Sequence, residues 1–468
     1  MAEQASFKQS LGLLDSTMIV AGSMIGSGIF IVSADITRNV GSAGWLIIVW
    51  LITGFMTITA AVSYGELSGM FPKAGGQYVY LKEAYNPLAG FLYGWSFFAV
   101  IQTATIAAVG VAFSKFLAYM VPSVSEELVA YDFGFITISN AQLVAIGVII
   151  FLTFINTLGV HSGKLIQTTF TVTKILSLFG LIVFGLMHMK TDVWNTNWTD
   201  GWHLHALNST TDYVTVAAFG AMSAAMVGSI FSSDAWNNVT FIAAEIKNPK
   251  RNIGLALFLG TLIVTIIYVT TNIMYTAVLP LSEIAGAEKD RVAVAASQVI
   301  FGNLGTVVIA LMIMISTFGC INGLVLAGAR VYYTMAQDGL FFKQAGRLNR
   351  NAVPGWALWV QCLIAAILCL SGKYGDLLTM VSFVVVIFYA LTIAGIFILR
   401  KKKPELERPY RAFGYPLFPG IYILLAAIFC VGLVYTLPKY SLWGLGIALA
   451  GIPLYYLAVS RQKKINHH

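Results

Sequence analysis

Long apolar runs separated by short polar segments set the pattern of this 468-residue chain. Each run is long enough for an α-helix to cross the hydrocarbon core of a bilayer, which takes about 20 residues. None of them alternates apolar and polar residues as membrane β-strands do. The runs lie near residues 11–36, 42–67, 88–121, 141–160, 165–188, 213–244, 252–279, 296–336, 354–371, 376–399, 413–436 and 441–460. The pattern predicts an all-α polytopic membrane protein with about 12 transmembrane helices.

The composition agrees with a membrane location for nearly the whole chain. Hydrophobic residues make up 58% of it and charged residues only 10%, whereas soluble domains carry about 25% charged residues. We expect a cytoplasmic N-terminal segment at 1–10, a ten-helix core at 11–400, and a basic loop, two further helices and a cytoplasmic C-terminus at 401–468. The first run follows a polar start without a cleavage site, so it is expected to remain as the first span.

Positive charges indicate the orientation of the spans. With both termini in the cytoplasm, most of the 28 Lys and Arg residues fall on the cytoplasmic side, as the positive-inside rule requires. The densest groups are Arg400–Arg411, Lys247–Arg251 and Arg461–Lys464. The formal net charge of +8 is therefore a signal of topology in the plasma membrane, and no nucleic-acid partner is expected.

Motifs of enzymes and metal sites are missing from the sequence. It contains no HExxH, no G-x-S-x-G and no metal-ligand spacing, so no enzymatic activity, metal or cofactor is expected. The four cysteines, Cys320, Cys362, Cys369 and Cys430, all fall inside predicted spans. Since none lies in an outer loop, neither a disulfide framework nor a disulfide-linked partner is expected.

Two of the apolar runs contain residues that interrupt a helix. The stretch GSMIGSGIF, Gly22–Phe30, places three glycines in the first run, and small or polar residues at Ser232–Asn238 interrupt the sixth. A broken helix exposes backbone N–H and C=O groups, which are tolerated inside a membrane only around a ligand or water. One interruption in each half of a ten-span core is typical of secondary transporters built from two inverted repeats of five helices, with the substrate at the midplane.

The exposed backbone groups indicate the chemistry of the ligand. The N–H groups of Gly26, Ser27 and Gly28, at the positive end of a half-helix, suit a carboxylate. Carbonyl oxygens of the two interruptions suit an ammonium. An α-amino acid carries both charged groups close together, and glycine lets it approach the backbone. The pattern therefore predicts an amino-acid site between the interruptions.

Two ionisable residues fall at membrane depth, where charge is costly and usually functional. Lys174 lies about ten residues into the fifth span, too deep for its ammonium to reach the interface. Asp234 lies in the interrupted part of the sixth span. A structural role stays open for each. Lys174 could hydrogen-bond the carbonyls of a broken neighbouring helix, and Asp234 could cap a half-helix.

Several long motifs resemble the amino acid–polyamine–organocation (APC) superfamily. They are GSMIGSGIF, the stretch Tyr64–Tyr85, FSSDAW at 231–236 and AAEIKNPKRNI at 243–253. The stretch Ser316–Phe341 and the loop KKPELERPYRAFGYP at 402–416 resemble, more specifically, the L-type amino acid transporter family. Its members are Na⁺-independent exchangers, which in animals pair with a single-span glycoprotein. The resemblance runs from the first span to the eleventh and implies the APC fold, with discontinuous helices 1 and 6.

The resemblance also implies roles for individual residues. The positions that match substrate-binding positions of the family are Met24, Ile25, Gly26, Ser27, Gly28, Phe231, Ser232, Asp234 and Tyr275. Residues 26–28 match the segment that receives the substrate carboxylate. The carbonyls of Met24 and Ile25, and those of Phe231 and Asp234, match the groups that receive its ammonium. Phe231 also matches the aromatic gate that closes over the bound amino acid.

Lys174, Thr317 and again Tyr275 match less specific features of the family. Lys174 matches a fifth-helix lysine whose ammonium occupies a place that sodium fills in related folds, which implies transport without Na⁺. Tyr275 matches a seventh-helix tyrosine near the pocket. Thr317 lies where an eighth-helix hydroxyl faces the same region. Plain helix packing explains Tyr275 and Thr317 equally well.

This sequence departs from the family pattern around the sixth-helix interruption. Ser233 replaces a bulky residue and Ala235 replaces a glycine, so the pocket shape is expected to differ. The Asp234 carboxylate either faces a cationic side chain, admitting Lys, Arg or ornithine beside neutral amino acids, or is tied to the backbone. The partner-linking cysteine of the outer loop is absent, which favours a chain that works without a covalent heavy-chain partner.

We expect alternating access, in which helices 1, 2, 6 and 7 rock against helices 3, 4, 8 and 9 around the bound amino acid. The resemblance implies a Na⁺-independent antiporter of L-α-amino acids. An alternative is a proton-coupled importer with Lys174 as the proton carrier, because burial can let a lysine release its proton. A third alternative is a polytopic sensor or channel-like protein, which the absence of a soluble signalling domain disfavours.

Overall fold

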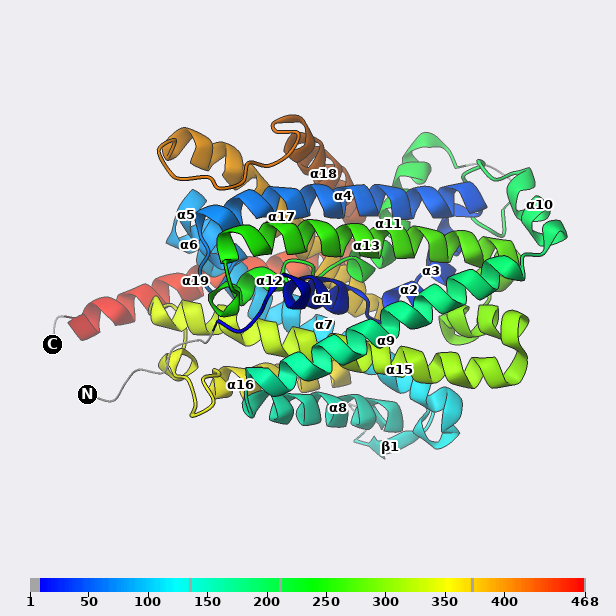
Figure 1. Ribbon diagram of the computed structural model, residues 1–468, viewed down its shortest axis with the longest axis horizontal. Coiled ribbons are helices and arrows are strands. Elements are labelled where there is room, and N and C mark those ends of the chain that lie inside the picture. The colour runs from blue at the N-terminus through cyan, green and yellow to red at the C-terminus, as the bar shows by residue number, and fades with distance from the viewer. Residues whose placement is uncertain (1–8, 134–136, 210–212, 372–373, 467–468) are drawn as a thin grey trace.

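The computed structural model describes residues 9–133, 137–209, 213–371 and 374–466. In these ranges, eleven helical segments are long and apolar enough to cross a membrane, and Gly355–Leu370 is a shorter apolar helix. Together they confirm the prediction of an all-helical membrane protein with about 12 spans. Most of the long helices run roughly along one direction and form a single bundle (Figure 1).

The elements follow one another along the chain with short connections. The first half forms α1 (Leu13–Met24), α2 (Gly28–Ile31), α3 (Ser33–Val40), α4 (Ala43–Met70), α5 (Gln77–Ala84), α6 (Pro87–Ser96), α7 (Gln102–Met120), α8 (Asn140–Thr157), α9 (Val160–Met187) and α10 (Thr191–Thr199). The second half forms α11 (Thr215–Ser232), α12 (Asn238–Phe241), α13 (Pro249–Val278), α14 (Leu281–Ala285), α15 (Val292–Gln337), α16 (Gly355–Ser371), α17 (Tyr374–Lys402), α18 (Leu417–Thr436) and α19 (Pro438–Asn466).

Three irregular features were not expected from the apolar pattern. A π-helical turn, Phe97–Ile101, joins α6 to α7 inside the third span. Gly302, with φ of 68°, divides α15 into two helices at a kink. A small antiparallel hairpin pairs β1 (Val129–Asp132) with β2 (Thr137–Ser139) in the connection between α7 and α8.

The two ends of the bundle differ. The described chain starts and α19 finishes at one end, on the left of Figure 1, which we call the terminal end. It also carries the connection 403–416 between α17 and α18. The other end carries α10 and the hairpin, on the right of Figure 1, and we call it the opposite end.

The helix α1 occupies the middle of the bundle, packed against α9, α13 and α15. The pair α4 and α13 is in close contact, since a Cβ at Gly254 would lie only 3.5 Å from the Cα of Gly65. Small residues at such crossings let the backbones of membrane helices approach closely. Because α9, α13 and α15 all pack against α1, they hold it from several sides at the depth where it breaks.

Both predicted interruptions are present. α1 ends at Met24 and α2 begins at Gly28, so the backbone leaves the helix between them. α11 ends at Ser232 and α12 begins at Asn238. A Cβ at Gly28 would clash with the Ser232 hydroxyl and lie 3.0 Å from the Ser232 Cα. The two interruptions therefore touch, and glycine is required at Gly28 for this contact.

Candidate functional site

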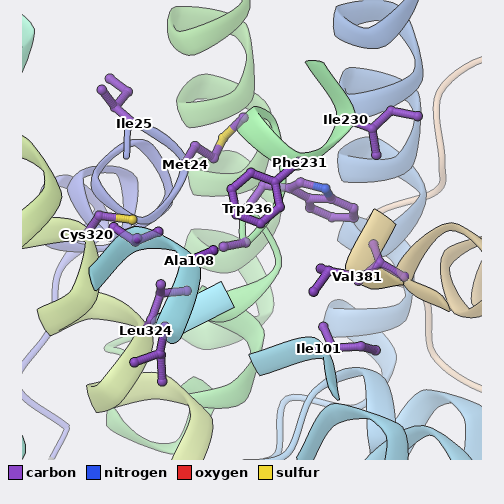
Figure 2. Packing of buried hydrophobic residues seen from close by; sticks show 14 of the residues in the cluster. Met24, Ile25, Ile101, Ala108, Ile230, Phe231, Trp236, Cys320, Leu324 and Val381 are labelled. Carbon is purple, nitrogen blue, oxygen red and sulfur yellow. The ribbon is translucent and has the colours of Figure 1, made fainter. Parts of the chain in front are cut away.

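A small cavity lies where the two interruptions meet, and we call it the central cavity. Its volume is about 10 Å³, about the space of one water-sized probe. Its lining consists of Ser23, Met24, Gly26, Ser27, Gly28, Thr105, Val109, Phe231, Ser232, Asp234, Ala235 and Cys320. Seven of the nine predicted substrate positions belong to this lining, all but Ile25 and Tyr275. Figure 2 shows Met24 and Phe231 close together beside Trp236. The Ser23 hydroxyl is buried there without a hydrogen-bond partner.

Lys174, on α9, holds the first interruption from outside the cavity. Its ammonium donates to the carbonyl oxygens of Gly22 at 2.7 Å, Ile25 at 2.6 Å and Ser316 at 3.2 Å. An ammonium has three donors, and these bonds use all of them. The alternative in which Lys174 hydrogen-bonds the carbonyls of a broken neighbouring helix matches this arrangement.

The helix α15 adds two further groups to the first interruption. The Ser316 hydroxyl lies 3.2 Å from the Ile25 carbonyl and 3.3 Å from that of Gly26. The Cys320 thiol lies 3.1 Å from the Ser23 carbonyl. The Thr317 hydroxyl instead donates within its own helix, to Ile313 and Met314. The α15 face toward α1 is thus one residue out of register with the expected position.

Tyr268, on α13, bridges the two interruptions and was missed in the sequence. Its hydroxyl lies 3.0 Å from the Met24 carbonyl and 3.0 Å from the Ser232 carbonyl. Its ring packs edge-to-face against Trp50, with centroids 5.2 Å apart. Tyr275 lies two helical turns further along α13, and its hydroxyl donates to the Ile29 carbonyl at 3.2 Å. The spacing of seven residues puts both tyrosines on one face of the helix, which is the signal that could have identified Tyr268.

Asp234 and Ala235 form the turn that follows α11. Ala235 has φ of 63°, a left-handed conformation that glycine adopts more readily than a residue with a Cβ. One carboxylate oxygen of Asp234 accepts a hydrogen bond of 2.5 Å from the Tyr389 hydroxyl. Tyr389 also lies 3.2 Å from the Asn237 side-chain oxygen, and Asn237 donates to Gln77 at 2.9 Å. Asp234 is thereby linked to α17 and α5.

A large hollow opens at the opposite end, and we call it the vestibule. Its volume is about 860 Å³. Val32, Val227 and Gly228 belong to its lining, and Gly228 is about one helical turn from Phe231 along α11. Its charged lining residues are Asp35, Arg38, Lys115, Glu126, Asp290 and Asp376. Phe231 is 6% exposed and lines the central cavity, one helical turn along α11 from the vestibule residue Gly228.

The terminal end is closed by ion pairs. Lys82 and Asp338 are 2.6 Å apart, and Tyr78 donates to Asp338 at 2.7 Å. Burial, together with the hydrogen bond to Asp338, raises the pKa of Tyr78, so its hydroxyl keeps the proton that it donates. Deeper in the bundle, Arg330 pairs with Glu245 at 3.0 Å, and both side chains are almost completely buried.

The segment before α1 is fastened to the same cluster. The backbone N–H groups of Ser10 and Leu11 donate to the Glu245 carbonyl at 3.0 and 3.1 Å, and Leu11 pairs in parallel with Ile246. The start of the first span is therefore tied to the residues that follow the second interruption. The terminal end is therefore held together by ion pairs and backbone hydrogen bonds, whereas the vestibule opens at the opposite end.

Comparison with known proteins agrees with this architecture. The family model for amino acid permeases matches residues 11–457. The chain is 29% identical over 460 residues to the large neutral amino acids transporter small subunit 2 of Homo sapiens, covering 98% of this chain and 82% of that protein. It is 29% identical over 459 residues to the serine/threonine exchanger SteT of Bacillus subtilis, covering 97% and 98%. It is 28% identical over 465 residues to the b(0,+)-type amino acid transporter 1 of Mus musculus, covering 97% and 88%.

The matched region contains both interruptions, Lys174 and the ion pairs of the terminal end. The resemblance drawn from the sequence motifs is confirmed, and the chain belongs to the amino acid permease family.

Proposed function

We propose that the chain is a Na⁺-independent exchanger of L-α-amino acids that works by alternating access. The observation that carries the proposal is the meeting of two interrupted membrane helices at a buried cavity, with a vestibule on one side and ion pairs on the other. Irregular backbone at this depth is expected only where it serves a ligand. The named relatives transport or exchange amino acids, which supports the same class of substrate here.

The amino acid is proposed to bind across the two interruptions. Its carboxylate would meet the backbone N–H groups of Gly26, Ser27 and Gly28, which line the central cavity. Its ammonium would meet carbonyls of Met24 and of the 231–234 segment. In the present conformation the Met24 carbonyl accepts from the Tyr268 hydroxyl at 3.0 Å and from the Gly26 N–H at 2.8 Å. Substrate binding would therefore turn the Gly26 N–H from Met24 to the carboxylate, which frees one lone pair of the Met24 carbonyl for the ammonium. The buried Ser23 hydroxyl would gain a partner from the ligand.

Phe231 is proposed as the gate of this site. It lines the central cavity one helical turn from the vestibule residue Gly228, and the cavity is too small for an amino acid in the present conformation. A rotation of the Phe231 side chain, with movement of α11, would connect the two spaces. Closure of Phe231 over a bound amino acid would then precede opening of the terminal end.

Lys174 is proposed as a fixed cation that replaces Na⁺. Its three hydrogen bonds join α1 to α9 and α15, and a neutral amine, with two N–H donors, would lose one of them. This supports an ammonium that stays charged through the cycle, and it disfavours Lys174 as a proton carrier. Tyr275 and Ser232 would support the site through the backbone, since the Ser232 hydroxyl donates to Gly228 at 2.6 Å.

For topology, we propose that the terminal end faces the cytoplasm and the vestibule faces outward across the plasma membrane. The cluster Arg400–Arg411 and the basic residues at 247–251 lie at the terminal end, which fits the positive-inside rule. We also propose that the chain works without a covalent heavy-chain partner. During transport, α1, α4, α11 and α13 would rock as one unit against α6–α7, α8, α15 and α16.

The test uses purified protein in liposomes that are loaded with, or lack, unlabelled amino acids. Entry of radiolabelled neutral and cationic amino acids is followed in Na⁺-free buffer at equal pH on both sides. Uptake confined to loaded vesicles is the expected result. Uptake into empty vesicles that needs an inward proton gradient would favour the proton-coupled importer, and absence of flux would favour the sensor.

A further inference from the structure

The Asp234 carboxylate lies deep in the bundle, and among the residues that the structure describes it has no positively charged partner. Its side chain is 7% exposed. Its hydrogen bonds come from the Tyr389 hydroxyl and from the backbone at Ala235. Within the described ranges, no Lys, Arg or His forms an ion pair with it. Lys174, the other ionisable group at this depth, turns its ammonium toward backbone carbonyls of α1 and α15.

The groups that face Asp234 from the surrounding elements do not supply a positive charge. They are Tyr389 on α17, Tyr93 on α6, Tyr422 on α18 and Cys320 on α15. An isolated carboxylate in such surroundings is unfavourable, and it needs a proton or a bound cation to become neutral. Inside a membrane the cost is larger still, and such groups usually take part in transport.

Asp234 is also the residue at which three small cavities meet. One is the central cavity. The second, of about 10 Å³, is lined by Gln77, Gln102, Asn237 and Asn238 among others, and we call it the carboxamide cavity. The third, of about 20 Å³, lies beside Ser233, Trp236 and Tyr422. Each is close to the space that one water needs.

The carboxamide cavity offers Asp234 a route to water. The Asn238 side-chain nitrogen lines it and is buried without a hydrogen-bond partner, which marks a place for a water molecule. Gln77, on α5, places the cavity on the side of the terminal end. Once the terminal end opens, a proton could therefore pass between Asp234 and that end through ordered water.

We propose that Asp234 balances the charge of the substrate. With a neutral amino acid bound, its carboxylate holds one proton taken from water; with a cationic amino acid bound, the cationic side chain takes the place of that proton. The inference rests on the proposed exchange function and adds its proton stoichiometry. The proton bound with a neutral substrate on one side is released to water on the other.

A consequence follows for exchange between the two substrate types. When external lysine enters, its side chain carries one positive charge inward, and the internal neutral amino acid leaves with one proton on Asp234. One positive charge moves in each direction, so the exchange is electroneutral and the vesicle interior becomes alkaline. If Asp234 kept a constant protonation state, the same exchange would carry net positive charge inward without a pH change.

The experiment uses proteoliposomes loaded with the pH dye pyranine and with L-serine or L-leucine. External L-lysine is added at equal pH, with valinomycin and potassium setting the membrane potential. We expect the interior to become alkaline by about one proton per lysine, at a rate that the potential does not alter. Addition of the neutral amino acid outside should give exchange without a pH change.

Three outcomes separate the possibilities. Lysine exchange without a pH change that accelerates at negative interior potential overturns the inference and leaves the exchanger intact. Exchange of neutral amino acids, with no exchange of lysine, arginine or ornithine even at alkaline pH, overturns it too. Loss of all exchange contradicts the proposed function itself.

A matched pair of variants localises the effect. Asp234→Asn keeps the side-chain shape and an oxygen for Tyr389, and it should exchange neutral amino acids while losing lysine exchange at least tenfold and losing the pH signal. Asp376→Asn removes a carboxylate of the vestibule and should leave both signals unchanged. A pH signal retained in Asp234→Asn overturns the assignment. If that variant does not fold, the measurement on the unmodified chain still decides.

Discussion

The Lys174 ammonium donates a hydrogen bond of 2.6 Å to the carbonyl oxygen of Ile25. From the sequence, the Ile25 carbonyl was expected to receive the ammonium of the substrate. The Lys174 ammonium already satisfies the Ile25 carbonyl, so we propose that the substrate ammonium uses the neighbouring Met24 carbonyl. Because Ile25 ends the α1 helix, the lysine supports the shape of the interruption whether or not a substrate is bound.

Replacement of this lysine should show that it holds the interruption. Lys174→Met would remove the hydrogen bonds to three carbonyl oxygens, of which Ile25 keeps the 3.2 Å bond from the Ser316 hydroxyl. Each buried polar group left unpaired costs about 1–3 kcal/mol. We expect a clearly lower melting temperature in detergent and loss of exchange. Lys190→Met, at an exposed position of the opposite end, is the control and should change neither. Normal exchange by Lys174→Met would refute the role.

Tyr268 is expected to set the affinity for substrate. Tyr268→Phe removes the donor shared by the Met24 and Ser232 carbonyls and leaves the ring against Trp50. Since one hydrogen bond contributes about 0.5–1.5 kcal/mol, the KM for exchange should rise about tenfold, with a smaller change in the maximal rate. Tyr275→Phe, whose hydroxyl bonds Ile29 outside the cavity, should raise KM less. Equal effects of the two changes would contradict this assignment.

The left-handed residue at the second interruption provides a test of backbone strain. Ala235 has φ of 63°, which costs a residue with a Cβ about 1 kcal/mol relative to glycine. Ala235→Gly should therefore raise the melting temperature slightly. Ala225→Gly, inside α11, should lower it, because glycine in a helix interior costs about 1 kcal/mol. Destabilisation by both changes would show that the turn is not strained.

The buried ion pair of Arg330 and Glu245 should control whether the terminal end or the opposite end of the bundle is open. Removing one partner of a buried ion pair costs about 3–5 kcal/mol, so Glu245→Gln should loosen the contacts of Ser10 and Leu11 and favour opening of this end. Cys320 is a reporter, since its thiol is 2% exposed at the central cavity. With the other cysteines replaced by alanine, a thiol reagent should label Cys320 faster in Glu245→Gln than in its absence.

A double variant makes the same test specific for the ion pair. Arg330→Met alone should also speed the labelling of Cys320, and the combination with Glu245→Gln should add little, because the interaction is already lost. Fully additive effects of the two changes would mean that the residues act independently. Slower labelling in either single variant would contradict the idea that the pair keeps the terminal end closed.

The predictable parts of the site are those where the membrane limits what a single segment can do, because unpaired backbone groups are not tolerated in lipid. Glycines and polar residues at Gly22–Gly28 and Ser232–Asn238 had to break helices, and a break in lipid has to face a ligand. The depth of Lys174 likewise indicated partners on a broken helix. Each of these inferences needs only the residues of one segment.

Contacts between distant helices were not predictable in the same way. Tyr268 and Met24 are 244 residues apart, and Tyr389 and Asp234 are 155 apart. The chain has 21 tyrosines, and the sequence does not indicate which of their hydroxyls donates to a carbonyl of an interruption. Ser316, instead of the expected Thr317, faces the first interruption for a geometric reason. One residue corresponds to about 100° of rotation around a helix, and the orientation of α15 depends on packing and on its kink at Gly302.

The vestibule has a consequence for pharmacology. At about 860 Å³ it is as large as pockets that hold drug-sized molecules. A bulky amino-acid derivative could anchor its charged part near Asp35 and Arg38 and never pass Phe231. Wedged between α3, α7 and α17, it would block the rocking motion rather than compete at the interruptions. Such an inhibitor would act from one side of the membrane, and excess substrate would not displace it.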